Sequence, residues 1–282
     1  MINTNEVVVV GTLVEAEAIT GTAKTGKPYV RGDLTIKVGE EQMIPISFFS
    51  SQYSSKGTPL KNYDTFLGIN EWLNKRVRVT ATLTENKFFS SQRGSLVKSN
   101  RLNVRWINLL PATSTEEDST HFRIAGFVAE GIKEVVDAEQ NVTDCLIKIG
   151  QSNYSGTQAD VFTLNVDPTN TKAVDVLSNQ YTVGSSIVLE GHLDFTIKEE
   201  HVSVPSDFGG DMVKTYQKSS KRYVITQGTR VDSNLEYTTE DIQKLVDGAK
   251  ANDEEVIAKA GTQPAATQKA APAQPVQVRK LI

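Results

Sequence analysis

A strand pattern that occurs twice along the chain constrains the fold more than any other feature. The segment VGTLVE at residues 10–15 aligns with AGFVAE at residues 125–130, so a glycine, an apolar pair and a glutamate recur in the same order. Residues 77–83 and 187–193 also alternate apolar side chains in the same phase, 110 positions apart. A repeat of this kind predicts two copies of one folding unit.

Short strands dominate the first copy. Runs rich in Val, Ile and Thr alternate with a period of two and are separated by turn residues such as those of Gly26-Lys27-Pro28. We expect five strands, at residues 6–15, 29–38, 42–49, 76–83 and 102–110. Residues 50–75 are too many for a bare loop and predict a short helix near residues 63–72. Five antiparallel strands with a helix after the third are typical of an OB-fold.

The remaining sequence completes a two-unit organisation. Residues 111–120 are rich in Pro, Ser, Thr and acids and have no periodicity, which indicates a linker. The second copy predicts its own helix at residues 169–179, and Ala, Pro, Gln and Thr dominate the C-terminal end. We therefore expect an all-β protein with minor helices, divided into OB-fold domain 1 (1–110), the linker (111–120), OB-fold domain 2 (121–234), an amphipathic helix (235–260) and a flexible tail (261–282).

The net charge of −4 hides a strong asymmetry between these units. Residues 1–110 contain 14 Lys and Arg against 9 Asp and Glu, a net charge of +5. Residues 111–234 contain 10 against 18, a net charge of −8. The first unit therefore suits a polyanionic partner, and the second does not.

Several classes of function are disfavoured by the composition. No apolar run approaches the roughly 18 residues of a membrane span, and no signal peptide is seen, so we expect a cytoplasmic protein without a membrane partner. The single cysteine, Cys145, has no internal disulfide partner, and the 3 histidines lack metal-ligand spacing. We expect no metal, no cofactor and no catalytic residues, because neither a nucleophile with its base nor a phosphate loop is present.

The alternation of the strands predicts a binding surface on the first unit. Unpaired nucleic-acid strands are held by cations along the phosphates and by rings on which bases stack. In the second and third strands, the outward phase contains Tyr29, Arg31, Lys37 and Phe49, while the fourth strand turns its arginines away from Val77 and Val79. The alternative is that these cations merely form a solvated strand face.

The segment between the fourth and fifth strands adds two adjacent rings. Successive strand residues point oppositely, so at least one of Phe88 and Phe89 is expected on the surface; the alternative is a ring packed beneath its own hairpin. The expected nucleic-acid-binding residues are Tyr29, Arg31, Lys37, Phe49, Arg76, Arg78, Lys87, Phe88, Phe89, Arg93 and Lys98.

The second unit lacks the cations of the fourth strand, since Ser186 and Val188 occupy the positions of Arg76 and Arg78. A basic run before its last strand forms a possible second patch, or pairs internally with acids such as Glu199 and Asp211. The residues of this patch are Lys214, Tyr216, Lys218, Lys221 and Arg222.

Taken in order, four motifs resemble the bacterial single-stranded DNA-binding protein family, an OB-fold group. They are VVVGTLV at residues 8–14, TGKP at 25–28, IPISFF at 44–49 and RVRVTATL at 76–83. The resemblance implies binding of single-stranded DNA without sequence specificity in replication, recombination or repair, and no catalysis. It assigns contacts to Phe49, Phe88 or Phe89, Arg31, Arg76, Arg78, Lys87 and Arg93.

Two departures modify this expectation. The family usually has one barrel per chain and an acidic tail tip that recruits replication proteins, whereas this chain has two predicted barrels and ends in RKLI. Members with two barrels form dimers, so the resemblance implies a homodimer. The amphipathic stretch at residues 239–260 could dock a replication or recombination protein instead of the tail. So divergent a pair of barrels would suit a bacteriophage or plasmid protein.

A different function stays open alongside this one. The acidic second unit and the helical C-terminal segment would also suit an OB-fold protein-interaction or virion structural module that does not bind nucleic acid. Fold alone does not decide between the two.

Overall fold

A computed structural model describes residues 4–205, 211–231 and 236–262. Ten strands belong to one sheet, and the described helices are short except for the last. The elements in chain order are β1 (Asn5–Thr22), β2 (Pro28–Val38), β3 (Gln42–Ser51), α1 (Lys61–Leu67), the 3-10 helix η1 (Ile69–Trp72), β4 (Arg76–Ser90), β5 (Ser95–Leu109), β6 (Ser119–Val136), β7 (Val142–Ser152), β8 (Ala159–Val166), α2 (Thr171–Gln180), β9 (Ser186–Pro205), β10 (Asp211–Arg230) and α3 (Thr239–Thr262).

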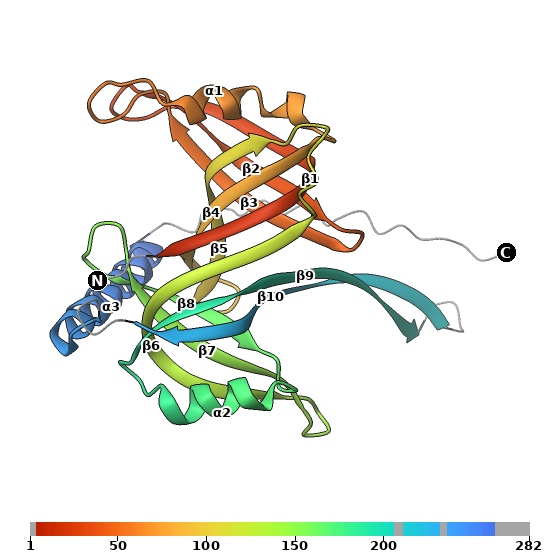
Figure 1. Ribbon diagram of the computed structural model, residues 1–282, viewed down its shortest axis with the longest axis vertical. Helices are drawn as coiled ribbons and strands as arrows, with labels where there is room; N and C mark the ends of the chain where they lie inside the picture. Colours follow the sequence, from red (N-terminus) through yellow and green to blue (C-terminus); the bar gives the residue numbers. More distant parts are fainter. Residues whose placement is uncertain (1–3, 206–210, 232–235, 263–282) are drawn as a thin grey trace.

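The first five strands close into a barrel because β1 pairs with two neighbours in succession. Its first half pairs with β4, from Val7 to Thr12, and its second half pairs with β2, from Thr12 to Thr22. Strands β2 and β3 form one hairpin and β4 and β5 another, and the barrel is completed where β3 meets β5 in parallel at Ser47 and Asn103. Helix α1 caps this barrel at the upper end of Figure 1.

The second set of five strands repeats this plan. Strand β6 pairs first with β9 and then, from Phe127 onward, with β7. The barrel is completed where β8 meets β10 in parallel at Asn165 and Val224. Helix α2 lies against it at the lower end of Figure 1, in the place that α1 has on the first barrel. The two-barrel, all-β fold expected from the sequence repeat is confirmed.

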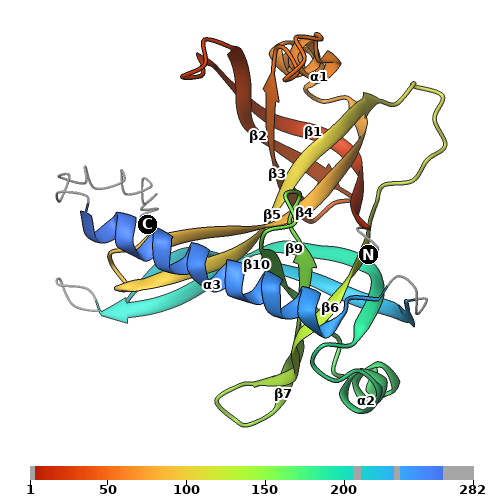
Figure 2. The ribbon, with the colours of Figure 1, turned by 90° about the vertical axis from the view of Figure 1, so that its left-hand side faces the viewer.

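The barrels are joined by a ladder between β1 and β6, which runs antiparallel from the Asn5–Ile124 pair to the Val10–Ser119 pair. The last helix provides a second connection, because α3 packs against β4 and β5 of the first barrel and against β8 of the second. Figure 2 shows α3 running along the hairpin of β4 and β5. Within the described residues, no helix is both long and apolar enough to cross a membrane.

The strands are longer than their sequence patterns predicted. We expected the fourth strand to end at Leu83 and the fifth to begin at Leu102, but β4 continues to Ser90 and β5 starts at Ser95. The added residues pair in regular register from Thr84 opposite Arg101 to Ser90 opposite Ser95. Polar residues predominate here, and the apolar ones occur as the adjacent pairs 88–89 and 96–97, so the apolar alternation that marks a half-buried strand is missing. The tail predicted at residues 261–282 lies outside the described residues beyond Thr262.

The bend of β1 requires a glycine at its centre. A Cβ atom at Gly11 would lie 2.3 Å from the Lys37 carbonyl oxygen on β2, and one at the repeat-related Gly126 would lie 2.4 Å from the Gly150 carbonyl oxygen on β7. Both contacts are with backbone, which cannot move aside as a side chain can. The glycine shared by the two sequence copies is therefore explained by the close approach of two strands.

Replacing either glycine by alanine is expected to destabilise the protein by about 1–3 kcal/mol, because the new methyl group forces the strand backbones apart. Urea denaturation of Gly11→Ala and Gly126→Ala measures the loss. The matched control is Gly131→Ala in β6, where a Cβ would meet no atom within 4 Å. Equal stability of all three variants would contradict the close-approach explanation.

Candidate nucleic-acid interface

Two stacked rings and a cation form an exposed group on the outer face of β2 and β3. The Tyr29 and Phe49 rings lie 5.6 Å apart at 29°, and the Phe49 side chain is 62% exposed. Arg31 is opposite Phe49 in the strand register and points to the same face. Among the described residues Arg31 has no carboxylate partner. We call Tyr29, Arg31 and Phe49 the ring platform.

This group lies where alternation along the strands predicted it. The inward phase of β2 and β3 supplies core residues such as Leu34 and Ile46, each about 1% exposed. Because neighbouring residues of a strand point to opposite faces, the intervening side chains are directed to solvent. Lys37, the other predicted cation of β2, is half-buried and pairs in register with Met43 at the far end of the same face.

A cation that the sequence analysis did not select adjoins the platform along β3. Arg101 of β5 donates from Nε to Ser47 Oγ at 2.7 Å, and its guanidinium lies 3.6 Å from Asp33. Ser47 in turn donates to the Asp33 carboxylate at 2.5 Å. Strands β3 and β5 meet in parallel at this point, and strand alternation alone does not reveal that contact.

The predicted arginines of β4 point outward but are paired with acidic residues of the linker. Arg76 lies 2.6 Å from the Asp118 carboxylate and also donates to the Glu116 carbonyl oxygen. Arg78 forms an ion pair with the Glu116 side chain. All four side chains remain between 31% and 45% exposed, so water screens both pairs.

The predicted lysines of the hairpin are paired as well. Lys87 is only 7% exposed and lies 2.8 Å from Asp253 of α3 and 3.1 Å from Glu85. Lys98 lies 2.5 Å from the other oxygen of Asp253. Burial lowers the pKa of Lys87, but the nearby carboxylates of Asp253 and Glu85 outweigh it, and the net shift is upward. Lys87 therefore anchors α3 and does not present its charge to solvent.

The two adjacent rings of the hairpin differ in exposure, because successive residues of a strand point to opposite faces. Phe88 is 48% exposed, whereas Phe89 on the opposite face is half-buried. Arg93 is exposed in the turn that follows them, and its backbone N–H donates to Ser90 Oγ. Phe88 and Arg93 are thus exposed, as is Lys98, whose ammonium group is paired with Asp253.

Only part of the possible second patch lies among the described side chains. Lys221 is exposed, with its Nζ 6.0 Å from the centroid of the Phe195 ring. Arg222 is paired internally, 3.0 Å from Asp144 and 3.5 Å from Asp194. The side chains of Lys214, Tyr216 and Lys218 lie outside the described residues. The described ranges contain no cluster of His, Cys, Asp and Glu suited to a metal ion.

A half-buried carboxyl group at the junction of the barrels has a raised pKa. Asp160 of β8 is close to Glu85 of β4, and burial together with the Glu85 charge raises its pKa to about 6 despite the opposing effect of Lys87. Folding then favours the protonated form, because the ordinary pKa of an aspartate in the unfolded chain is 3.8.

From this shift we expect the Asp160 contribution to stability to be greatest below pH 4, to fall between pH 4 and about 6, and to stay low above pH 6. Asp160→Asn removes the titration, so its free energy of unfolding relative to the natural chain should increase as pH rises through this window. Urea denaturation at pH 4.5 and pH 7 measures the difference. Parallel pH profiles of the two proteins would contradict the assignment.

The paired barrels and their exposed ring platform define a tandem OB-fold protein. Within that class, the chain belongs to the YorF family, whose model matches residues 3–263. No curated protein matches the chain. The OB fold implied by the motifs is the fold observed.

Among solved structures, the wild-type single-stranded DNA binding protein from Thermus aquaticus is similar at 11% identity and a TM-score of 0.46, over 84% of this chain and 98% of that chain. A deletion mutant of the same protein gives 12% identity and a TM-score of 0.47 over the same shares.

Proposed function

We propose that this protein binds single-stranded DNA without sequence specificity and protects it, with no covalent chemistry. The ring platform carries the proposal. Two stacked rings, one of them well exposed, provide a surface for a base, and Arg31 beside them is free of carboxylates among the described residues. Each base of a single strand has a π-face that can stack on such a ring, whatever its identity.

The platform predicts that Phe49→Ala lowers affinity for oligo-dT by about 1–3 kcal/mol, the contribution of one base stack, with little change in stability. Arg31→Ala should also reduce the slope of log affinity against log salt by about 0.7, the value for one phosphate contact. Fluorescence titrations at several salt concentrations measure both effects.

The matched control for the ring is Tyr154→Ala, which removes a fully exposed ring from the turn between β7 and β8 on the second barrel. A comparison of dT with rU oligomers tests the preference for DNA, because only the 2′-hydroxyl and the thymine methyl group distinguish them. If the unaltered chain shows no affinity for either, or an affinity that salt does not change, the proposal fails.

The linker pairs yield a separate prediction. Asp118 and Glu116 form ion pairs with the guanidinium groups of Arg76 and Arg78, which a phosphate would otherwise contact. Neutralising both carboxylates, as Glu116→Gln with Asp118→Asn, should raise affinity and steepen the salt slope by up to about 1.4, two phosphate contacts. Thermal stability should change little, because exposed ion pairs contribute about 0–1 kcal/mol.

The control for this pair is Glu240→Gln with Glu254→Gln, which changes net charge equally at two exposed positions on α3. The same gain in affinity in both double variants would mean that general charge, and not release of Arg76 and Arg78, is responsible.

The resemblance of the motifs extends this proposal to cellular context. On this basis we propose that the protein acts in DNA replication, recombination or repair, inside a bacterium and in a bacteriophage-type setting, as a homodimer with four barrels. Helix α3 is the proposed docking element for replication or recombination proteins. Light scattering on the purified chain distinguishes a dimer from a monomer.

A second function is favoured by the paired cations. Four of the predicted contact residues, Arg76, Arg78, Lys87 and Lys98, already have carboxylate partners, which leaves a smaller cationic surface than the sequence predicts. A protein-interaction or virion structural module with OB folds would have no need of free cations. A high-order assembly that ignores oligonucleotides would support this alternative.

A further inference from the structure

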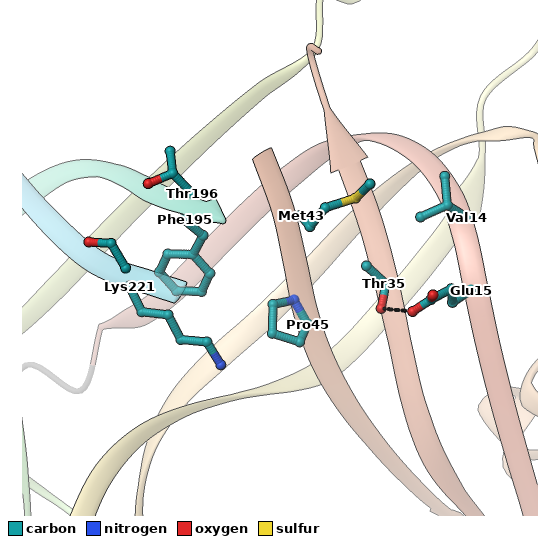
Figure 3. Close-up of a pocket in the computed structure, with 9 residues that line it drawn as sticks. Val14, Glu15, Thr35, Met43, Pro45, Phe195, Thr196 and Lys221 are labelled. Carbon is teal, nitrogen blue, oxygen red and sulfur yellow. Dashed lines mark hydrogen bonds between the residues drawn. The ribbon is translucent and has the colours of Figure 1, made fainter. Parts of the chain in front are cut away.

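A groove separates the outer face of the first barrel from the ribbon of β9 and β10. It consists of two adjoining cavities of about 480 and 290 Å³, which share Pro45 of β3, Phe195 of β9 and Lys221 of β10. Figure 3 shows the larger one, with Lys221 running alongside the Phe195 ring and Pro45 facing them from β3. Both barrels therefore line a single depression.

The floor of this groove continues the face that bears the ring platform. Along β3, residues 49, 47, 45 and 43 alternate with buried positions, so Phe49 and Pro45 point to the same side of the strand. At about 3.3 Å per residue, these two residues are about 13 Å apart. A polymer lying on the platform along β3 would enter the groove after this short distance.

Among the described residues that line the groove, one cation has no carboxylate partner. Of the carboxylates among the described groove residues, Asp33 accepts a hydrogen bond from Ser47 and lies 3.6 Å from Arg101. Glu15, at the far side of Thr35, accepts a hydrogen bond from Thr35 Oγ1 at 2.8 Å and keeps its charge. Lys221 has no carboxylate partner among the described residues. Its ammonium group is therefore free to meet an anion.

The Phe195 ring lies beside Lys221 and is held in place by its packing. It packs edge-on against Tyr223 at a centroid distance of 5.2 Å and an angle of 80°, and it is almost fully buried. The edge of the Phe195 ring and the Pro45 ring thus bound an apolar slot next to the exposed Lys221. The larger cavity is within the range of about 300–1,000 Å³ typical of small-molecule sites, ample for one nucleotide.

We propose that the groove holds the continuation of the same DNA strand that lies on the ring platform. One phosphate contacts Lys221, the adjacent nucleotide occupies the slot beside Pro45 and Phe195, and the second barrel thereby contributes to one continuous site. The inference rests on the proposed function, since it assigns a second part of the path to that ligand.

The test compares long and short oligo-dT on three variants at position 221. Lys221→Met keeps the apolar stem against Phe195 and removes the charge, whereas Lys221→Arg keeps the charge. For a strand of about 30 nucleotides, Lys221→Met should weaken binding roughly 5-fold at 0.1 M salt and reduce the salt slope by about 0.7, while Lys221→Arg retains affinity. Charge reversal in Lys221→Glu should weaken binding further.

A strand of about 6 nucleotides, near the lower limit of the site of one OB fold, should bind the platform alone and be unaffected by any of these changes. The matched control is Lys172→Met, which removes an exposed cation from α2, away from the groove. If Lys221→Met and Lys172→Met behave alike with the long strand while Phe49→Ala still weakens it, the groove proposal is wrong and the proposed function stands. If the unaltered chain binds neither strand, both are wrong.

Discussion

Both barrels depend on a strand that hydrogen-bonds to two different partners in succession. For β1 these partners are β4 and then β2, and for β6 they are β9 and then β7. Such a strand must bend sharply while it stays in contact with backbone on both sides, which leaves no room for a Cβ at Gly11 or Gly126. Once the bend is set, the inward phase of the next two strands follows from packing. The outward phase of β2 and β3 then presents the rings and Arg31, so the platform is a consequence of barrel closure.

Carboxylates from other parts of the chain pair with the cations of the first barrel and so reduce the positive charge of its surface. Acids of the linker meet the arginines of β4, and Asp253 of α3 meets the lysines of the hairpin. A net charge of +5 over residues 1–110 therefore overstates the positive surface available to a ligand. The exposed linker pairs cost little to exchange for phosphates, whereas the buried pair at Lys87 is costly to break because a lone charge would remain in the interior.

The sequence predicted the fold well because its signals are local or repeated. Strand alternation gave the inward residues of β2 and β3, and the recurring glycine identified the second barrel. The same alternation placed Tyr29, Arg31 and Phe49 on the surface, where the structure has them. Position on an outward face says nothing about what folds over it, however. The partner of Lys98 is Asp253, 155 residues away, and the Arg101 contact arises where β3 and β5 meet in parallel. The groove combines side chains of both barrels, so no pattern within one segment could have revealed it.

The ladder between β1 and β6 has a consequence for any long ligand. The nine-residue connection between β5 and β6 by itself would let the two barrels reorient freely, but six successive residue pairs bind them into one continuous sheet. An extended guest in contact with both barrels would then meet a preorganised template whose spacing and curvature are set before the encounter. The entropy of aligning the two halves is lost once, when the chain folds, and not again at each association.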